Sequence, residues 1–165
     1  MRANRLIPIA VLAFAVACSE DSSNLVAVDG LASAGSPHFI ANATSCTQVG
    51  FNLVCNFKEA GLSAGTVVTI SVTVAANAGY ACVNGGGNIP SDPKKSDSGN
   101  LTDSESFTVP KNGNLVEDLT VSPKPANEVL SCPGGQTATL ISVEYFVPAT
   151  ILDATSGASI SVGGF

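Results

Sequence analysis

The residues most suggestive of catalysis are Gly61-Leu62-Ser63-Ala64-Gly65, which spell the G-x-S-x-G motif of serine hydrolases. In that motif the serine sits on a sharp turn from a strand into a helix, and its acidic and histidine partners follow later in the chain. Here a strand-like segment follows the motif, and the single histidine, His38, precedes it. We therefore interpret Gly61–Gly65 as a turn between two strands, and we predict no catalytic residues.

Two sets of residues have side chains of the kinds that bind metals in other proteins. The most polar segment, Pro90–Ser106, contains four carboxylates that a calcium ion would accept as ligands, Asp92, Asp97, Asp103 and Glu105. Their spacing is not that of an EF-hand, so we expect a solvated loop instead. Four cysteines are enough for zinc, but the chain has no Cys-x₂-Cys pair. We predict neither a metal nor a cofactor.

Two glycine-rich segments are the candidate binding loops. A phosphate-binding loop would need a helix after its glycines, and the sequence after these segments does not favour one. We expect tight turns beside a disulfide, in loops of the kind that often carry binding sites on rigid β-domains. The residues concerned are Asn84, Gly85, Gly86, Gly87 and Asn88 in the first loop, and Pro133, Gly134 and Gly135 in the second.

The cysteines predict a disulfide framework. Cys46 and Cys55 enclose Gly50 and Asn52, so a hairpin would bring the two thiols face to face. Cys82 and Cys132 each lie where a strand gives way to one of the glycine-rich loops. Of the three connectivities that four cysteines allow, we predict Cys46–Cys55 and Cys82–Cys132.

Short strand-like segments separated by turn residues fill the rest of the chain. The clearest is Thr66–Val74, in which valine and isoleucine alternate with threonine and serine, a period of two that indicates a half-buried strand. Asn112-Gly113 predicts a hairpin between Ser106–Val109 and Leu115–Val121. The other expected strands are Phe39–Ala43, Phe51–Phe57, Gly79–Val83, Leu140–Val147, Thr150–Leu152 and Ser159–Val162. The last two are expected to pair. This pattern predicts an all-β fold, an antiparallel, immunoglobulin-like β-sandwich of about eight or nine strands.

The N-terminus has the pattern of an export signal. Arg2 and Arg5 precede a 12-residue apolar run, Leu6–Ala17, which is too short to span a membrane as a helix. The run ends in Ala15-Val16-Ala17-Cys18, which resembles the lipobox of bacterial lipoproteins. The resemblance implies cleavage before Cys18 and lipid on its thiol, with residues 1–17 as the signal peptide. Ala-x-Ala also suits ordinary signal peptidase, so plain secretion is the alternative.

The cysteine count favours the lipoprotein interpretation, because lipid on Cys18 leaves an even set of four. The resemblance also implies a lipid anchor in the bacterial cell envelope. Ser19 is not the aspartate that retains some lipoproteins at an inner membrane, so we expect the outer membrane if the cell has one. Residues 18–37, rich in Gly and Ser, are expected to form a tether, and residues 38–165 the folded domain.

Composition excludes several function classes. With 45% hydrophobic and 12% charged residues, the chain is too apolar for intrinsic disorder. Its net charge of −6 argues against nucleic-acid binding, which needs a basic surface. After removal of residues 1–17, five lysines and thirteen acidic residues leave a charge of −8 and no arginine.

The folded part has a second resemblance, carried by Cys55–Leu62, Tyr80–Gly87 and Leu130–Gln136. These segments resemble those of small secreted bacterial proteins of uncharacterised function, and they carry over no functional residue. We expect a cell-envelope lipoprotein with a non-catalytic binding module for an envelope protein or polymer. The alternatives are a structural envelope component without a discrete ligand, and a secreted hydrolase.

Overall fold

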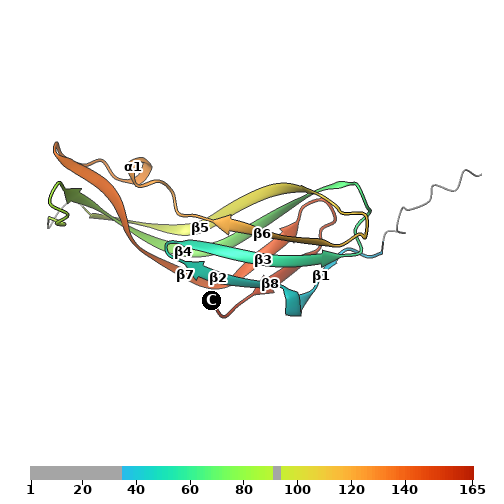
Figure 1. The fold of residues 1–165 in the computed structure, drawn as a ribbon. Coiled ribbons are helices and arrows are strands. Elements are labelled where there is room, and N and C mark those ends of the chain that lie inside the picture. Colours follow the sequence, from blue (N-terminus) through green and yellow to red (C-terminus); the bar gives the residue numbers. More distant parts are fainter. Residues whose placement is uncertain (1–34, 91–93) are drawn as a thin grey trace, which may run out of the picture.

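The computed structural model describes residues 35–90 and 94–165, which form two antiparallel β-sheets packed face to face (Figure 1). Its strands are β1 (His38–Phe39), β2 (Ser45–Val49), β3 (Asn52–Ala60), β4 (Val67–Asn84), β5 (Lys94–Thr108), β6 (Leu115–Val121), β7 (Gln136–Asp153) and β8 (Ser159–Val162). Two short helices, η1 (Ala41–Ala43) and α1 (Ala126–Val129), join them. The predicted all-β sandwich is confirmed, whereas its likeness to immunoglobulin domains stays a prediction. Cys18 and the predicted signal lie outside the described residues.

The two sheets have different central strands. In sheet A, β3 pairs with β6 on one side, and on the other side with both β2 and, near its end, β1. Sheet B has the order β5-β4-β7-β8, so that β4 lies between two long neighbours. All the pairings are antiparallel.

The main core lies between the sheets, and β4 contributes to it through every second residue. Val68, Ile70, Val72 and Val74 are buried, while the threonines and serine between them face outward. Strand β3 meets them from sheet A with alternate residues of its own, Leu53, Cys55 and Phe57. Burial of one such aliphatic or aromatic side chain contributes about 1.5–3 kcal/mol, so this alternation fixes which face of each strand points inward.

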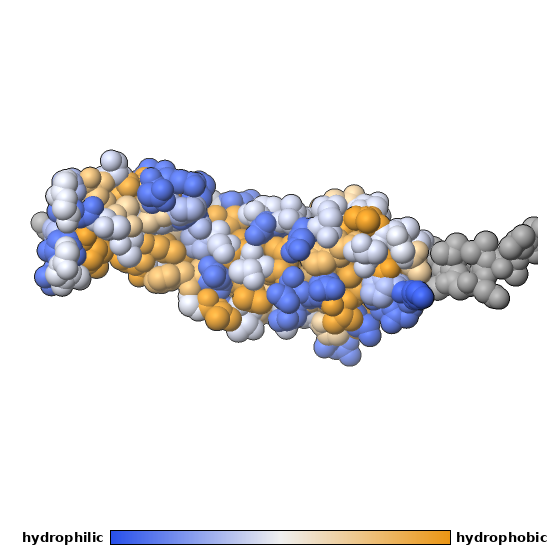
Figure 2. All heavy atoms as spheres, turned by 45° about the horizontal axis from the view of Figure 1, so that its top comes forward, coloured by the Kyte–Doolittle hydropathy of each residue, from blue (hydrophilic) through white to orange (hydrophobic). Residues whose placement is uncertain are grey.

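Beyond sheet A, the strands β4, β5 and β7 continue as a three-stranded ribbon (Figure 1). At about 3.3 Å per residue, the 18 residues of β4 span roughly 55 Å. A second small core covers one face of the ribbon, with Ala78, Tyr80 and Cys82 packed against Leu130 from the segment that contains α1. We call the end of this ribbon the distal tip; it lies at the left in Figure 2.

Both predicted disulfides are present. Cys46 and Cys55 are directly paired residues of β2 and β3, and Cys82–Cys132 joins β4 to the segment after α1 at the distal tip. In the described part of the chain, no helix is long and apolar enough to cross a membrane.

Four predictions about secondary structure are corrected. Of the strand predicted at Phe39–Ala43, only Phe39 belongs to a strand, β1, and Ala41–Ala43 form η1. Most of the predicted loop Pro90–Ser106 belongs to the 15-residue strand β5, because its backbone pairs with β4 from Ala81 to Val67. As an edge strand it needs little apolar surface of its own. The strands predicted at Thr66–Val74 and Gly79–Val83 are one strand, β4. Likewise β7 contains both Leu140–Val147 and Thr150–Leu152, joined through a register shift that holds Val147-Pro148.

The hairpin predicted across Asn112-Gly113 is also wrong, although the turn exists. Strand β5 belongs to sheet B and β6 to sheet A, so the turn connects the two sheets. Gly113 has a positive φ of 70°, and its carbonyl accepts a hydrogen bond from Leu62 N at 3.1 Å. Val109 bonds to Thr66 and Gly65 before the crossing. These contacts turn the chain toward β3 instead of back along β5. The predicted pairing of Thr150–Leu152 with Ser159–Val162 is confirmed.

Two carboxyl side chains are buried at the end of the main core opposite the tip. Glu59 of β3 and Asp153 of β7 are both 0% exposed. Asp153 Oδ1 accepts a hydrogen bond from Thr155 N at 2.8 Å, whereas Asp153 Oδ2 and both carboxyl oxygens of Glu59 are buried without a hydrogen-bond partner among the described residues. Burial and then the adjacent Asp153 carboxylate raise the pKa of Glu59 from 4.5 to about 7. The pair is therefore most stable when it holds a proton.

This pair predicts that stability declines toward alkaline pH. Because Glu59 binds its proton more tightly in the folded than in the unfolded chain, its contribution to the free energy of unfolding is complete below pH 4.5. That contribution is lost as the pH rises through about 7. Glu59→Gln keeps an amide donor for Asp153 and removes the titration. We expect its Tm to exceed that of the wild type at pH 8.5 by more than at pH 5.

The exposed Glu117→Gln on β6 is the matched control, and it should follow the wild type at both pH values. A difference in Tm between Glu59→Gln and the wild type that stays constant from pH 5 to pH 8.5 would contradict the raised pKa of Glu59.

Candidate functional site

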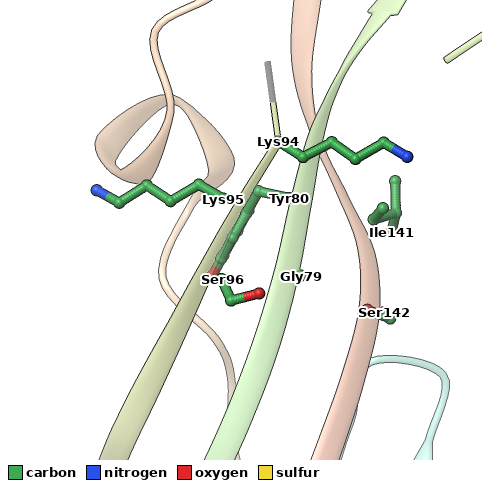
Figure 3. Close-up of a pocket in the computed structure, with 7 residues that line it drawn as sticks. All are labelled: Gly79, Tyr80, Lys94, Lys95, Ser96, Ile141 and Ser142. Carbon is green, nitrogen blue, oxygen red and sulfur yellow. The ribbon is translucent and has the colours of Figure 1, made fainter. Parts of the chain in front are cut away.

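A hollow lies on the ribbon close to the distal tip (Figure 3). It encloses about 250 Å³ and opens on the face of sheet B that points away from sheet A. Its lining comes from β4, β5 and β7: Gly79, Tyr80, Lys94, Lys95, Ser96, Ile141 and Ser142.

Gly79 leaves room on the outer face of β4 for the side chain of Ser142. Gly79 pairs with Ser96 of β5 on one side and with Ser142 of β7 on the other, so a serine lies on each side of a residue that has no side chain. A Cβ atom at residue 79 would collide with Ser142 Oγ. The register also shifts here, since Gly79 pairs with Ser142 but Tyr80 with Leu140. Ile141 is thus an extra residue, and it lies at the rim of the hollow, 37% exposed (Figure 3).

The two adjacent lysines at the start of β5 leave the strand in opposite directions (Figure 3). Lys95 Nζ donates a hydrogen bond to the carbonyl of Val129 at 3.0 Å and thereby ties β5 to the α1 segment. Lys94 reaches across β4 toward Ile141 and over the hollow (Figure 3). The lining therefore offers two hydroxyls and an ammonium group, with no carboxylate and no histidine. Such a set can donate hydrogen bonds to oxygen-rich groups and accept hydrogen bonds from hydroxyls.

Beneath the hollow, the tip is held by several contacts of different kinds. Tyr80 Oη donates to the carbonyl of Lys124 at 2.9 Å, and burial followed by the Asp97 carboxylate raises the pKa of this phenol. Lys124 Nζ forms a salt bridge with Asp97 at 2.9 Å. The Cys82–Cys132 disulfide closes the same layer. The hollow is thus built on a supported sheet.

The two predicted binding loops lie beside one another at the distal tip, because Asn84 pairs with Gln136. The first loop is a self-contained turn in which Asn84 Oδ1 accepts hydrogen bonds from Gly86 N and Asn88 N, each at 3.0 Å. The second closes with a bond from Gln136 N to the carbonyl of Pro133 at 3.2 Å. Their role in binding stays a prediction.

The other residues singled out in the sequence lie elsewhere. Ser63 sits in the turn between β3 and β4, so the turn interpretation of Gly61–Gly65 is confirmed. His38 donates from Nδ1 to the carbonyl of Ser36 at 2.8 Å. Asp97 and Asp103 are six residues apart on β5, about 20 Å along the strand, and Asp92 is outside the described residues. Within residues 35–90 and 94–165, no three His, Cys, Asp or Glu side chains are grouped to hold a metal.

Sequence reasoning missed the hollow. A glycine inside an alternating strand was its one signal, because such a residue often marks a bulge or a close approach of the backbone. The neighbours Ser96 and Ser142 could not be identified without the register of three strands.

No family model, curated protein or solved structure matches the chain.

The contacts at the tip predict that the two disulfides differ in importance. Cys82–Cys132 spans 50 residues and Cys46–Cys55 spans 9. Loop-closure entropy then gives about 4 kcal/mol of stabilisation for the first and about 2.6 kcal/mol for the second. We expect the double variant Cys82→Ser/Cys132→Ser to open the tip and make residues 122–135 the first site of limited proteolysis.

The matched control is Cys46→Ser/Cys55→Ser, which should leave residues 122–135 protected. Equal cleavage of this segment in the two double variants would show that the disulfide does not hold the tip.

Proposed function

We propose that the protein is a cell-envelope lipoprotein whose folded domain is a non-catalytic binding module. The carrying observation is that the hollow and both glycine-rich loops lie at the distal tip, at the far end of β4 from the start of the described chain. Gly35, the first described residue, lies against Gly61, where β3 has just ended and β4 is about to begin. A tether that entered there would hold the tip away from the membrane.

Export and anchoring rest on the cysteines. Two disulfides are consistent with an exported protein, since disulfides persist in oxidising compartments. They use four of the five cysteines, and Cys18 is the fifth. Lipid on Cys18, at the end of an apolar run that follows two arginines, accounts for the odd thiol. Two or three acyl chains would anchor the protein stably, because a single chain binds membranes only marginally.

Binding is favoured over catalysis by the chemistry of the lining. The hollow supplies Ser96, Ser142 and Lys94, which hydrogen-bond to oxygen-rich groups but do not form a nucleophile–base pair. A rigid floor under these groups reduces the entropy lost when a ligand binds. The alternative, a structural envelope component, does not require a hollow lined by hydrogen-bonding side chains.

The anchoring part of the proposal has a direct test. We expect wild-type protein extracted from membranes to have the mass of Cys18–Phe165 plus acyl chains. The Cys18→Ser variant should lose the acyl mass and leave the membrane fraction. A wild-type chain without acyl groups and with one free thiol would contradict lipidation and favour plain secretion.

The binding part of the proposal is tested by closing the hollow. Ser142→Phe places an aromatic ring beside Gly79 on an exposed strand position that tolerates large residues. We expect the full chain with this change to lose saturable retention on isolated envelope material, at least about tenfold in apparent Kd, a change of about 1.4 kcal/mol.

The control is Ser45→Phe, the same change on an exposed position of β2 in sheet A, and it should bind like the wild type. Absence of saturable retention by the wild type would favour the structural component. Turnover of an envelope substrate that disappears in Ser63→Ala or His38→Ala would instead favour the hydrolase.

A further inference from the structure

The hollow is one end of a larger surface on the outer face of sheet B. Alternate residues of β5 from Ser96 to Ser106 are Ser, Ser, Asn, Thr, Ser and Ser, and all are exposed. Their partners on β4 include Thr69, Ser71 and Thr73. Thr150 of β7 and Ser161 of β8 extend one row to all four strands. We call this surface the hydroxyl face.

The hydroxyls of this face are held in pairs across the strands. Thr69 and Ser106 are joined at 3.0 Å, Thr73 and Thr102 at 2.9 Å, and Ser98 donates to Asn77 Oδ1 at 2.9 Å. Each hydroxyl is one donor and two acceptors, so a hydroxyl used once across the strands still has capacity toward solvent. Threonine side chains are also stiff at χ1. The face therefore presents ordered hydrogen-bonding groups.

Charge is absent from most of this face. The acidic residues of β5 alternate with the hydroxyl residues, so Asp97, Asp103 and Glu105 point to the other side of the strand. Over the rows from Ser106 to Asn100, the described residues on the face carry no ionisable side chain. Two ionisable side chains lie nearer the tip: Glu144, in the row between Phe146 and Gly79, and Lys94, at the hollow. The segregation is notable because the chain as a whole has a net charge of −6.

Two exposed apolar side chains lie among the hydroxyls: Leu152, which pairs with Ser71, and the aromatic ring of Phe146. Phe146 of β7 is 45% exposed and pairs with Ala75, whose small side chain leaves the ring uncovered. Asn100 lies beyond Ala75 in the same row. The next row holds Thr150, Thr73 and Thr102. From the hollow at Gly79 to Thr73 the distance along β4 is about 20 Å, enough for several sugar rings in a line.

These groups match the two kinds of surface on a neutral sugar. A pyranose ring has a face of C–H groups that packs on an aromatic ring, and an equatorial rim of hydroxyls that hydrogen-bonds to other hydroxyls and amides. The bare ring of Phe146 suits the first. The row of threonines on one side of it, and Ser98 and Asn77 on the other, suit the second. A polyanion would be repelled by the acidic domain and would find no arginine on it.

We propose that the hydroxyl face binds a neutral polysaccharide, with one sugar ring on Phe146 and the chain extending from the hollow at Gly79 toward Thr150. This inference rests on the proposed binding function and specifies its ligand class. Binding would be resistant to salt, since no ion pair contributes to it.

The test uses the full chain in detergent micelles, titrated with laminarin, xyloglucan and galactomannan as neutral probes and with alginate as the charged one. We expect saturable binding of at least one neutral polysaccharide that persists at high salt. Phe146→Ala should weaken it about tenfold, and the double variant Thr73→Val/Thr102→Val, which keeps side-chain shape, about fivefold.

Two further variants separate stacking from folding. Phe51→Ala removes an aromatic ring of matched exposure, 43%, in the turn between β2 and β3, and should change Kd by less than about twofold. Phe146→Trp should bind at least as tightly as the wild type, because the larger ring stacks as well. If Phe146→Ala does not fold, Phe146→Trp and the double variant Thr73→Val/Thr102→Val still test whether the hydroxyl face binds the polysaccharide.

Binding of none of the neutral probes, binding of alginate alone, or an equal loss in Phe51→Ala would overturn the proposal. If retention on envelope material is still lost in Ser142→Phe, the proposed function stands and only the ligand class is wrong. If the wild type shows neither retention on envelope material nor binding of a neutral polysaccharide, both the proposed function and the proposed ligand class are overturned.

Discussion

Strand β4 is the constraint on which the rest of the molecule depends. Its alternation of buried and partly exposed residues runs from Val68 to Tyr80, through two different cores. At the β3 end of the strand, large aliphatic side chains fill the space between the sheets. At the tip, alanine and Tyr80 pack against a thin segment that contains a single helical turn. Because this period of two holds as far as Tyr80, the outward face of β4 is polar along the main sandwich and reaches the hollow at Gly79 near the tip.

That single pattern connects the core to the surface proposed to bind ligand. Each residue buried on β4 fixes its neighbour outward, and the antiparallel register then aligns β5 and β7 beside it. This register places three features on one face: the rows of hydroxyls, the ring of Phe146 and the hollow at Gly79. The site is thus part of a continuous sheet, which a loop-based site would not be.

Sequence reasoning succeeded where the information was local. The alternation in Thr66–Val74 and the hairpin geometry of Cys46 and Cys55 depend on neighbours a few residues away, and both were predicted correctly. It failed for β5, because an edge strand with exposed faces needs no apolar pattern and its polar residues look like a loop. It also failed at Asn112-Gly113, whose turn was predicted but whose strands enter different sheets. The hollow and the hydroxyl face depend on the register of three or four strands. That register cannot be predicted from the pattern of a single sequence.

The Cys46–Cys55 disulfide gives the domain a defined response to mechanical force. A pull applied to the chain before Gly35 would first load β1, which pairs with β3 through two residues and would detach easily. The load would then reach Cys46, which is covalently bound to Cys55 in the central strand of sheet A. Peeling from this end must stop there, and the tension passes directly into β3 and the main core. The domain would therefore resist traction from its N-terminal side as one unit while its tip stays folded.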